Sequence, residues 1–290
     1  MTTGYLLDIS RSMRRAGRMA TGIDRVELAY IRHFLSQDVR LAGLARTAFG
    51  YILVDAAGLR SFHARLTGDV PWGRASLLSR MAGRREASLI RAESDLRRLA
   101  KARCAPGGLG RMLQRHFAQP YDYYNVGHSN LTNRMLAAVK ASGGRIHVMI
   151  QDVIPLELPE FQRPGTVSPF RDRIERVRRL ADRVIYVSAD TRSRAEAVMR
   201  LNGSVPPFVV AHNGVDVPLP DISLLAPGVM PDRPYFVTVG TIEPRKNHAF
   251  LLDLWDRMGT AAPPLLICGG RGWNNAAVFD RLDRLPPDGP

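Results

Sequence analysis

The segment 239–247, VGTIEPRKN, joins a strand-like run to a helical one through a short turn that holds two adjacent cations, Arg245 and Lys246. The residues before it, 235–239, are typical of a buried strand, and apolar side chains recur at helical spacing over 250–258. Free backbone N–H groups at a helix start bind phosphate, and strand carboxyl ends face the ligand crevice of an open α/β sheet. Arginine can hold two phosphate oxygens, and lysine adds a compact charge. The turn therefore predicts an anion site, with a solvated cationic turn as the alternative.

Strand-like and helical runs alternate outward from this segment along the whole chain. A polar, glycine-containing loop is expected over 11–20, and a helix begins at Thr21, which forms a capping box with Asp24. The strands are expected at 5–9, 50–54, 123–126, 146–150, 183–187, 208–211, 235–239 and 265–268. This alternation predicts an α/β protein with a largely parallel sheet.

Composition narrows the class of protein further. The chain has 290 residues, of which 45% are hydrophobic and 23% charged, as in globular proteins that bury a core. Its two cysteines are too few for a disulfide framework or a zinc site, which favours a reducing, cytoplasmic compartment and no metal. Residues 1–10 are typical of a strand rather than a signal peptide, and no run of 18 apolar residues predicts a membrane span.

The formal charge of +14 resides in the first half of the chain, most densely from Trp72 to Phe117. A single amphipathic helix is expected there, with Leu78, Ala82, Leu89, Leu96 and Ala100 on one side and Arg80, Arg84, Arg91 and Arg98 on the other. Such a helix either packs its leucines on the sheet or lies on an anionic membrane surface. Nucleic acid is not expected as a partner, because no recognition motif accompanies the charge.

Five prolines mark 217–234 as a linker. The expected domains are therefore 1–216 and 235–290, with the linker between them.

The motifs together resemble one known family. The segment 240–252, with CGGRGW at 268–273, resembles the start of the donor domain in retaining nucleotide-sugar glycosyltransferases of family 4, which have the GT-B fold. The segments 8–10 with 21–26, 125–129, 151–155, 187–191 and 213–216 resemble family segments in the expected order. The resemblance thus spreads over most of the chain.

The resemblance implies two Rossmann-like domains that face each other across a cleft. A mannose- or glucose-type hexose would pass from a nucleotide-diphosphate sugar to a glycan or lipid-linked acceptor, with retention and without a metal ion. Arg245 and Lys246 would neutralise the leaving diphosphate. Gly22 would let the backbone approach the donor phosphates, while Gly270 and Arg271 would lie near the base or ribose.

Two residues are candidates for catalysis. Asp152 occupies a position that histidine often precedes in this family, but Gln151 stands there in this sequence. Two roles remain open for Asp152: it is a general base, or it is a structural carboxylate at a strand end that caps the turn before Pro155. His128 follows an expected strand at the edge of the cleft, and a structural histidine is its alternative.

Only 56 residues follow Pro234, whereas the family's donor domain needs about 150, an ordinary domain length. An incomplete donor domain is therefore expected, with impaired activity or a partner chain that completes it. A non-catalytic peripheral membrane or acceptor-binding module is the alternative function. Either protein would work in the cytoplasm, at the inner face of the membrane where it binds lipid.

Overall fold

The computed structural model describes residues 4–81, 86–117, 120–217, 219–226 and 228–285. The chain divides into two compact units. Met1–Val153 and Asp172–Asn213 form the first unit, and Ile154–Arg171 and Gly214–Pro290 form the second. Within the second unit, the indole Nε1 of Trp273 donates a 2.9 Å hydrogen bond to the carbonyl of Phe161. This contact ties 154–171 to the later part of the chain.

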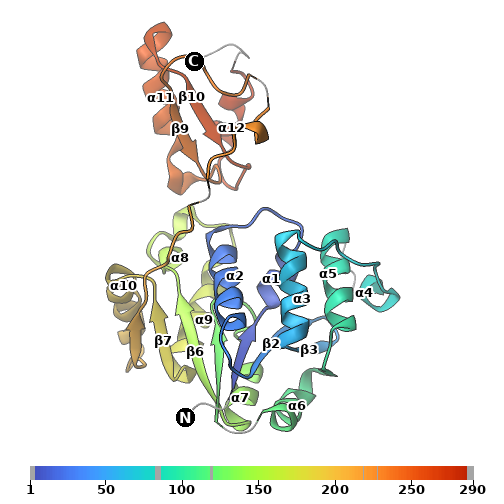
Figure 1. Ribbon diagram of the computed structural model, residues 1–290. Helices are drawn as coiled ribbons and strands as arrows, with labels where there is room; N and C mark the ends of the chain where they lie inside the picture. Colours follow the sequence, from blue (N-terminus) through green and yellow to red (C-terminus); the bar gives the residue numbers. More distant parts are fainter. Residues whose placement is uncertain (1–3, 82–85, 118–119, 218, 227, 286–290) are drawn as a thin grey trace. The chain divides into compact units, whose positions relative to one another are not determined.

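The first unit is built on one eight-stranded sheet, of which β2, β3, β6 and β7 are labelled in Figure 1. Its strands are β1 Tyr5–Asp8, β2 Leu41–Thr47, β3 Gly50–Asp55, β4 Ala102–Cys104, β5 Tyr121–Asn125, β6 Gly144–Ile150, β7 Arg183–Tyr186 and β8 Phe208–Val210. They lie in the order β4-β3-β2-β1-β5-β6-β7-β8. The ladders from β2 through β1 to β8 are parallel, while β3 pairs antiparallel with β2 and β4. The predicted α/β class with a largely parallel sheet is confirmed.

The helices of the first unit are α1 Ser10–Arg15, α2 Gly22–Leu35, α3 Ala56–Thr67, α4 Leu77–Met81, α5 Ala87–Arg98, α6 Leu109–His116, α7 Asn133–Ala141 and α10 Ala189–Arg200. Helix α9 Val167–Leu180 belongs to this unit from Asp172 onward, and α8 Ile154–Glu157 belongs to the second unit. Helices α1, α2, α3 and α5 pack together (Figure 1), and their core includes Leu7, Ile31, Phe62 and Leu96. None of the described helices is long and apolar enough to cross a membrane.

Part of the predicted loop 11–20 is helical, because α1 occupies Ser10–Arg15. Its first N–H groups are satisfied by acidic side chains from outside the helix: Asp8 accepts from the Ser10 N–H at 3.0 Å, and the more distant Glu27 accepts from the Ser12 N–H at 3.0 Å. A short helix that depends on such partners leaves no local periodic pattern. The helix predicted to begin at Thr21 is confirmed with its capping box.

The single amphipathic helix predicted within 72–117 is wrong. Two helices, α4 and α5, stand in its place, and Ala82 and Arg84 lie outside the described residues. Leu96 is fully buried and Leu89 packs on the same core, so α5 covers the sheet. Arg98 on α5 pairs with Asp95 at 2.6 Å. Within α5 the predicted arrangement holds, because Leu89 and Leu96 pack on the core while Arg91 and Arg98 are exposed.

The second unit contains a two-stranded parallel sheet of β9 Phe236–Val239 and β10 Leu265–Cys268. Helices α11 His248–Met258 and α12 Ala276–Leu282 accompany it. Ile242, Leu252 and Val278 are its buried apolar core. The strand side chains themselves remain half-buried or exposed, for example Val239, which is 76% exposed.

Candidate functional site

The first unit has a topological switch point at β1. From β1, the chain first adds β2 on one side and later β5 on the other, both parallel to it. In open α/β sheets, ligands bind outside the strand carboxyl ends where the order reverses in this way. Asp8 ends β1 and Asn125 ends β5, so these two residues mark the place.

A buried polar network occupies this switch point. The Tyr123 hydroxyl donates to Asp8 Oδ2 at 3.0 Å and accepts from Asn125 Nδ2 at 2.8 Å. Asn130 Nδ2 donates to the same Asp8 oxygen at 3.1 Å. Burial raises the pKa of Asp8, against the hydrogen bonds from Asn130 and Ser10. The Asn125 Oδ1 is buried without a partner among the described residues, so it can accept from a ligand or a water. Sequence reasoning missed the network, because its members are far apart in the chain.

A second buried acid lies beside this network. Glu27 Oε1 accepts from the Ser12 hydroxyl at 2.7 Å, and a Cβ built on Gly127 would stand 2.0 Å from Glu27 Oε2. The loop after β5 thus lies directly on the carboxyl group, with no room for a side chain at 127. Burial is the main cause that raises the pKa of Glu27 to about 8, and the charge of Asp8 adds to it.

The two predicted catalytic residues follow neighbouring strands, His128 after β5 and Asp152 after β6. His128 has φ of 54° and forms a 2.5 Å hydrogen bond through Nε2 to the carbonyl of Met149. A carbonyl only accepts, so Nε2 carries the proton and Nδ1 is the unprotonated nitrogen. Burial lowers the pKa of His128 to about 4, which keeps the ring neutral at pH 7. Asp152 is half-buried in the loop that follows β6.

Gly22 is the first residue of α2 and is exposed. A Cβ built on Gly22 would meet nothing within 4 Å, so packing within the chain does not require glycine there. Asp24 closes the cap by accepting from the Thr21 N–H at 2.8 Å, and it also accepts from Arg11 at 2.7 Å and Arg15 at 3.1 Å. The backbone at Gly22 is therefore open to an approaching group.

The four predicted donor-binding residues of the second unit lie in the segments that follow β9 and β10. An isolated bridge pairs Ile242 with Arg271, and the Ile242 N–H donates to the carbonyl of Gly270 at 3.0 Å. Gly240, with φ of 146°, lies so close to the loop after β10 that a Cβ on Gly269 would stand 1.8 Å from its oxygen. The fold thus brings the two glycine-containing turns into contact.

The cations of the predicted anion turn differ in their surroundings. They lie in the 3₁₀ turn Pro244–Lys246, which leads from β9 to α11 at His248 and so stands where the sequence predicted a short turn before a helix. Arg245 pairs with the buried Glu243 at 2.5 Å. The Lys246 Cε lies 3.7 Å from a Cβ built on Gly240, so its side chain follows the turn. Arg245 is held by the carboxylate of Glu243, so Lys246 is the better candidate for binding an anion.

Arg271 forms an exposed ion pair with Asp283, and its guanidinium lies over the Phe279 ring at 5.1 Å. Its neighbour Gly270 has open space where a Cβ would stand. The two residues predicted near a base or ribose thus combine an open backbone position with a cation held on α12.

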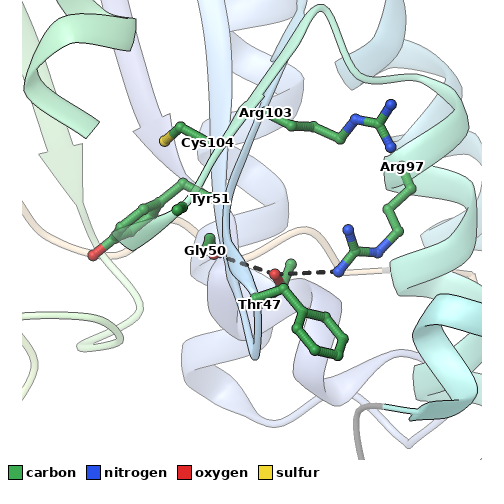
Figure 2. A pocket seen from close by; sticks show the side chains of 8 residues that line it. Thr47, Gly50, Tyr51, Arg97, Arg103 and Cys104 are labelled. Atoms are coloured by element: carbon green, nitrogen blue, oxygen red, sulfur yellow. Dashed lines mark hydrogen bonds between the residues drawn. The ribbon is translucent and has the colours of Figure 1, made fainter. Parts of the chain in front are cut away.

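A pocket with a volume of about 300 Å³ lies where β2 turns into β3 (Figure 2). It is lined by Thr47, Phe49, Gly50, Tyr51, Arg97, Arg103, Cys104 and Ala105. Arg97 Nη2 donates to the Thr47 hydroxyl at 3.3 Å, and its guanidinium lies over the Phe49 ring. Figure 2 shows Arg97 and Arg103 on one side of the hairpin. The Arg46 N–H donates to the Ser10 hydroxyl at 2.9 Å, which places this hairpin at the same sheet edge as Asp8.

Acidic and histidine side chains are scattered through the described part of the chain. Within it, no group of three or more His, Cys, Asp or Glu side chains is placed to hold a metal ion.

Comparison with known proteins gives one kind of relative. No family model matches the chain. Over 163 residues, or 51% of this chain, it is 29% identical to the serotype-specific mannosyltransferase WbdA of Escherichia coli. Two further WbdA sequences of the same organism are also 29% identical, over 164 residues. The chain spans about a fifth of the length of these relatives, because each match covers 20% of the relative.

Proposed function

We propose that this chain is a glycosyltransferase that moves a mannose-type hexose from a nucleotide-diphosphate sugar to a glycan or lipid-linked acceptor. The observation that carries the proposal is the 29% identity to mannosyltransferases over half of the chain. The switch point with its buried Asp8 and its unpartnered Asn125 Oδ1 supports a small-molecule site in the first unit. The resemblance to family 4 supports retention of the anomeric configuration.

The second unit would hold the nucleotide sugar. Lys246 lies over the Gly240 turn and would place its charge beside the leaving diphosphate, where negative charge develops as the glycosidic bond breaks. Arg245 would add a fork of donors, with its own charge balanced by Glu243. Gly270 and Arg271 would meet the base or ribose. Cations in these roles replace a metal ion, so we propose that transfer needs none.

The first unit would hold the acceptor. His128 is neutral at pH 7 and Asp152 follows the next strand, so both can contact sugar hydroxyls at the sheet edge. Gly22 would let the start of α2 approach the donor phosphates, because a helix N-terminus favours anions.

The test uses the full chain with guanosine-diphosphate mannose and with uridine-diphosphate glucose. Calorimetry measures the binding of each nucleotide sugar, and release of the nucleoside diphosphate measures its turnover. We expect Lys246→Ala to weaken binding about tenfold, which corresponds to about 1.4 kcal/mol. Lys101→Ala is the matched control, because Lys101 is an exposed lysine beside β4 in the first unit. Absence of binding by both nucleotide sugars, or equal effects of the two substitutions, would contradict the proposal.

A second candidate function is docking of the first unit on an anionic membrane surface, and α4 favours it. Leu77 and Met81 are 78% and 76% exposed, and Arg80 between them is also exposed. Apolar side chains beside arginine are the pattern of helices that lie in the headgroup region of anionic lipid. We propose that α4 makes this contact at the inner face of the membrane.

Flotation with phosphatidylcholine vesicles, with and without phosphatidylglycerol, tests this candidate. We expect wild type to float only with the anionic lipid, and the pair Leu77→Gln, Met81→Gln to remain in the dense fraction. Leu201→Gln is the control, since Leu201 is 83% exposed on the same unit but lies after α10. Flotation that survives the α4 substitutions, or that Leu201→Gln also abolishes, would count against membrane docking.

A further inference from the structure

The pocket at the β2–β3 hairpin is shaped by a close approach of two backbones. Gly50 has φ of 135°, and a Cβ built on it would stand 1.9 Å from the carbonyl oxygen of Cys104. Glycine at position 50 therefore lets β4 lie directly against the hairpin. A short turn joins the paired Thr47 and Gly50, and Phe49 in this turn is 44% exposed. The backbone of the hairpin and of β4 thus fixes the walls of the pocket, with an aromatic ring at its edge.

Arg97 reaches this pocket from α5 and is already held in place. Its Nε and Nη2 donate to Glu93 Oε1 at 3.2 and 2.7 Å, and Nη2 also donates to the Thr47 hydroxyl at 3.3 Å. The Arg97 side chain is only 10% exposed, and its guanidinium lies over the Phe49 ring. Its Nη1 has no hydrogen-bond partner within the described residues. A fixed guanidinium thus keeps two N–H donors for a ligand.

Arg103 supplies a charge that no carboxylate balances. Glu93 offsets the charge of Arg97, whereas Arg103 on β4 is exposed and forms no ion pair with any described residue. Gly50 and Ile52 are two residues apart on β3, so their cross-strand partners Thr47 and Arg103 lie on the same face of the sheet. Arg97 bonds Thr47 on that face, and Figure 2 shows both arginines on one side of the hairpin.

We propose that this pocket binds a single sugar unit that carries an anionic group, a carboxylate or a phosphate. None of the residues that line it is acidic, and two guanidinium groups suit either anion because arginine presents parallel N–H donors. The volume of about 300 Å³ lies at the lower end for small-molecule pockets, which fits one sugar ring. The face of the Phe49 ring carries partial negative charge, so it attracts the C–H groups of such a ring.

The pocket deepens the proposed function and rests on it for the identity of the ligand as a unit of the acceptor glycan. It lies beside β2, β3 and β4, away from the switch point between β1 and β5. Its occupant would therefore select the acceptor, and no bond would form or break within it. The binding itself does not depend on glycosyl transfer.

Titration of the full chain by ligand-observed NMR tests the pocket with methyl glucuronide, mannose 6-phosphate, the neutral methyl glucoside and inorganic phosphate. We expect both anionic sugars to bind about tenfold or more tightly than methyl glucoside, because hydrogen bonds to charged groups are the stronger ones. Mannose 6-phosphate should also bind more tightly than inorganic phosphate, which has no C–H groups to place on Phe49. Added salt should weaken the binding of the anionic sugars.

Two substitutions assign the binding to the pocket. Arg103→Gln should weaken both anionic sugars about tenfold. Phe49→Ala should weaken the sugars and leave inorganic phosphate unchanged. Arg91→Gln is the matched control, because Arg91 is an exposed arginine of α5, the helix that carries Arg97. Since Arg103 and Phe49 are both exposed, the thermal midpoints of their variants should stay close to that of wild type.

Each outcome bears on the inference. Tighter binding of methyl glucuronide would support the pocket with a uronic acid as its ligand, and tighter binding of mannose 6-phosphate would support it with a phosphorylated sugar. Equal binding of charged and neutral sugars, absence of binding, or an equal loss in Arg103→Gln and Arg91→Gln would overturn it. Sugar transfer without such binding would leave the proposed function standing. Binding in this pocket by a chain that transfers no sugar would contradict that function and leave the pocket standing.

Discussion

The hydroxyl of Tyr123 donates a 3.0 Å hydrogen bond to the carboxylate of Asp8, a residue 115 positions earlier in the chain. This bond joins the central strands β1 and β5 at the point where the strand order reverses. It also orients Asn125, whose side-chain amide donates to the same hydroxyl. The hydrogen bonds that link these two strands thus lie at the candidate site, at the carboxyl ends of β1 and β5.

Tyr123→Phe removes both hydrogen bonds, while Asp8 keeps Asn130 as a donor and Asn125 still donates to the carbonyl of Ser129. We expect the free energy of unfolding to fall by about 1 to 3 kcal/mol, the net contribution of two buried hydrogen bonds of which one is to a carboxylate. Tyr121→Phe is the matched control, because Tyr121 is an equally buried tyrosine of β5 whose hydroxyl bonds Ser142 instead. Glycosyl transfer should fall more in Tyr123→Phe than in Tyr121→Phe. Equal losses of activity at equal stability would contradict a role for Tyr123 at the site.

The stability of the first unit should fall as the pH rises from 6.5 to 8. Folded Glu27 has a pKa of about 8 against 4.5 for a free glutamate, so in this window the unfolded chain has released a proton that the folded chain keeps. His128, with its pKa lowered to about 4, has the opposite effect only below its ordinary 6.5. The expected loss is about 2 kcal/mol over the window.

Urea unfolding of wild type and Glu27→Gln at both pH values measures this loss. The substitution should abolish the pH dependence, while the exposed Glu160→Gln should preserve it. Asp8 has a raised pKa and faces Glu27, so its contribution has the same sign at lower pH. A slope that persists in Glu27→Gln would assign the effect to another group.

Gly127→Ala should destabilise the first unit by about 1 to 3 kcal/mol, as overpacking does. The new Cβ would overlap Glu27 Oε2, and Arg11 lies within 3.0 Å as well. Gly22→Ala is the control for stability, since its Cβ has open space. Chemical denaturation of both variants should separate them. The double variant Gly127→Ala, Glu27→Ala should lose less than the sum of its single substitutions, because they share one contact.

The division of the basic region into α4 and α5 predicts opposite results for two leucines. Leu96→Ala on α5 should cost about 2 to 5 kcal/mol, because Leu96 is fully buried in the core. Leu77→Ala on α4 should cost little, because its side chain is 78% exposed. Equal costs, measured by denaturant unfolding, would contradict this division of the region.

Strands with continuous apolar runs were predictable, as β6 and β10 illustrate. Strand β2 was not, because its sequence LAGLART contains Gly43 and Arg46. The structure explains the glycine: a Cβ at 43 would meet Ile9, Val54 and Leu59 at 3.0 to 3.2 Å. Close approach of three distant side chains is a tertiary requirement that no local pattern shows.

The candidate site was predictable only in part, for the same reason. The motifs around Gly22, Lys246 and Gly270 are contiguous in the sequence, so a resemblance could identify them. The network of Asp8, Tyr123 and Asn125 depends on strand order and helix packing. Its chemistry exists only after distant segments have come together.

Asp24 belongs to two structures at once: it closes the cap of α2 at Thr21, and it receives Arg11 from α1. The same carboxylate thus divides its hydrogen bonds between the cap of α2 and an arginine of α1. A displacement of Arg11 would weaken its hydrogen bond to Asp24, and the start of α2 at Gly22 would change with it. One side chain therefore couples the positions of two helices.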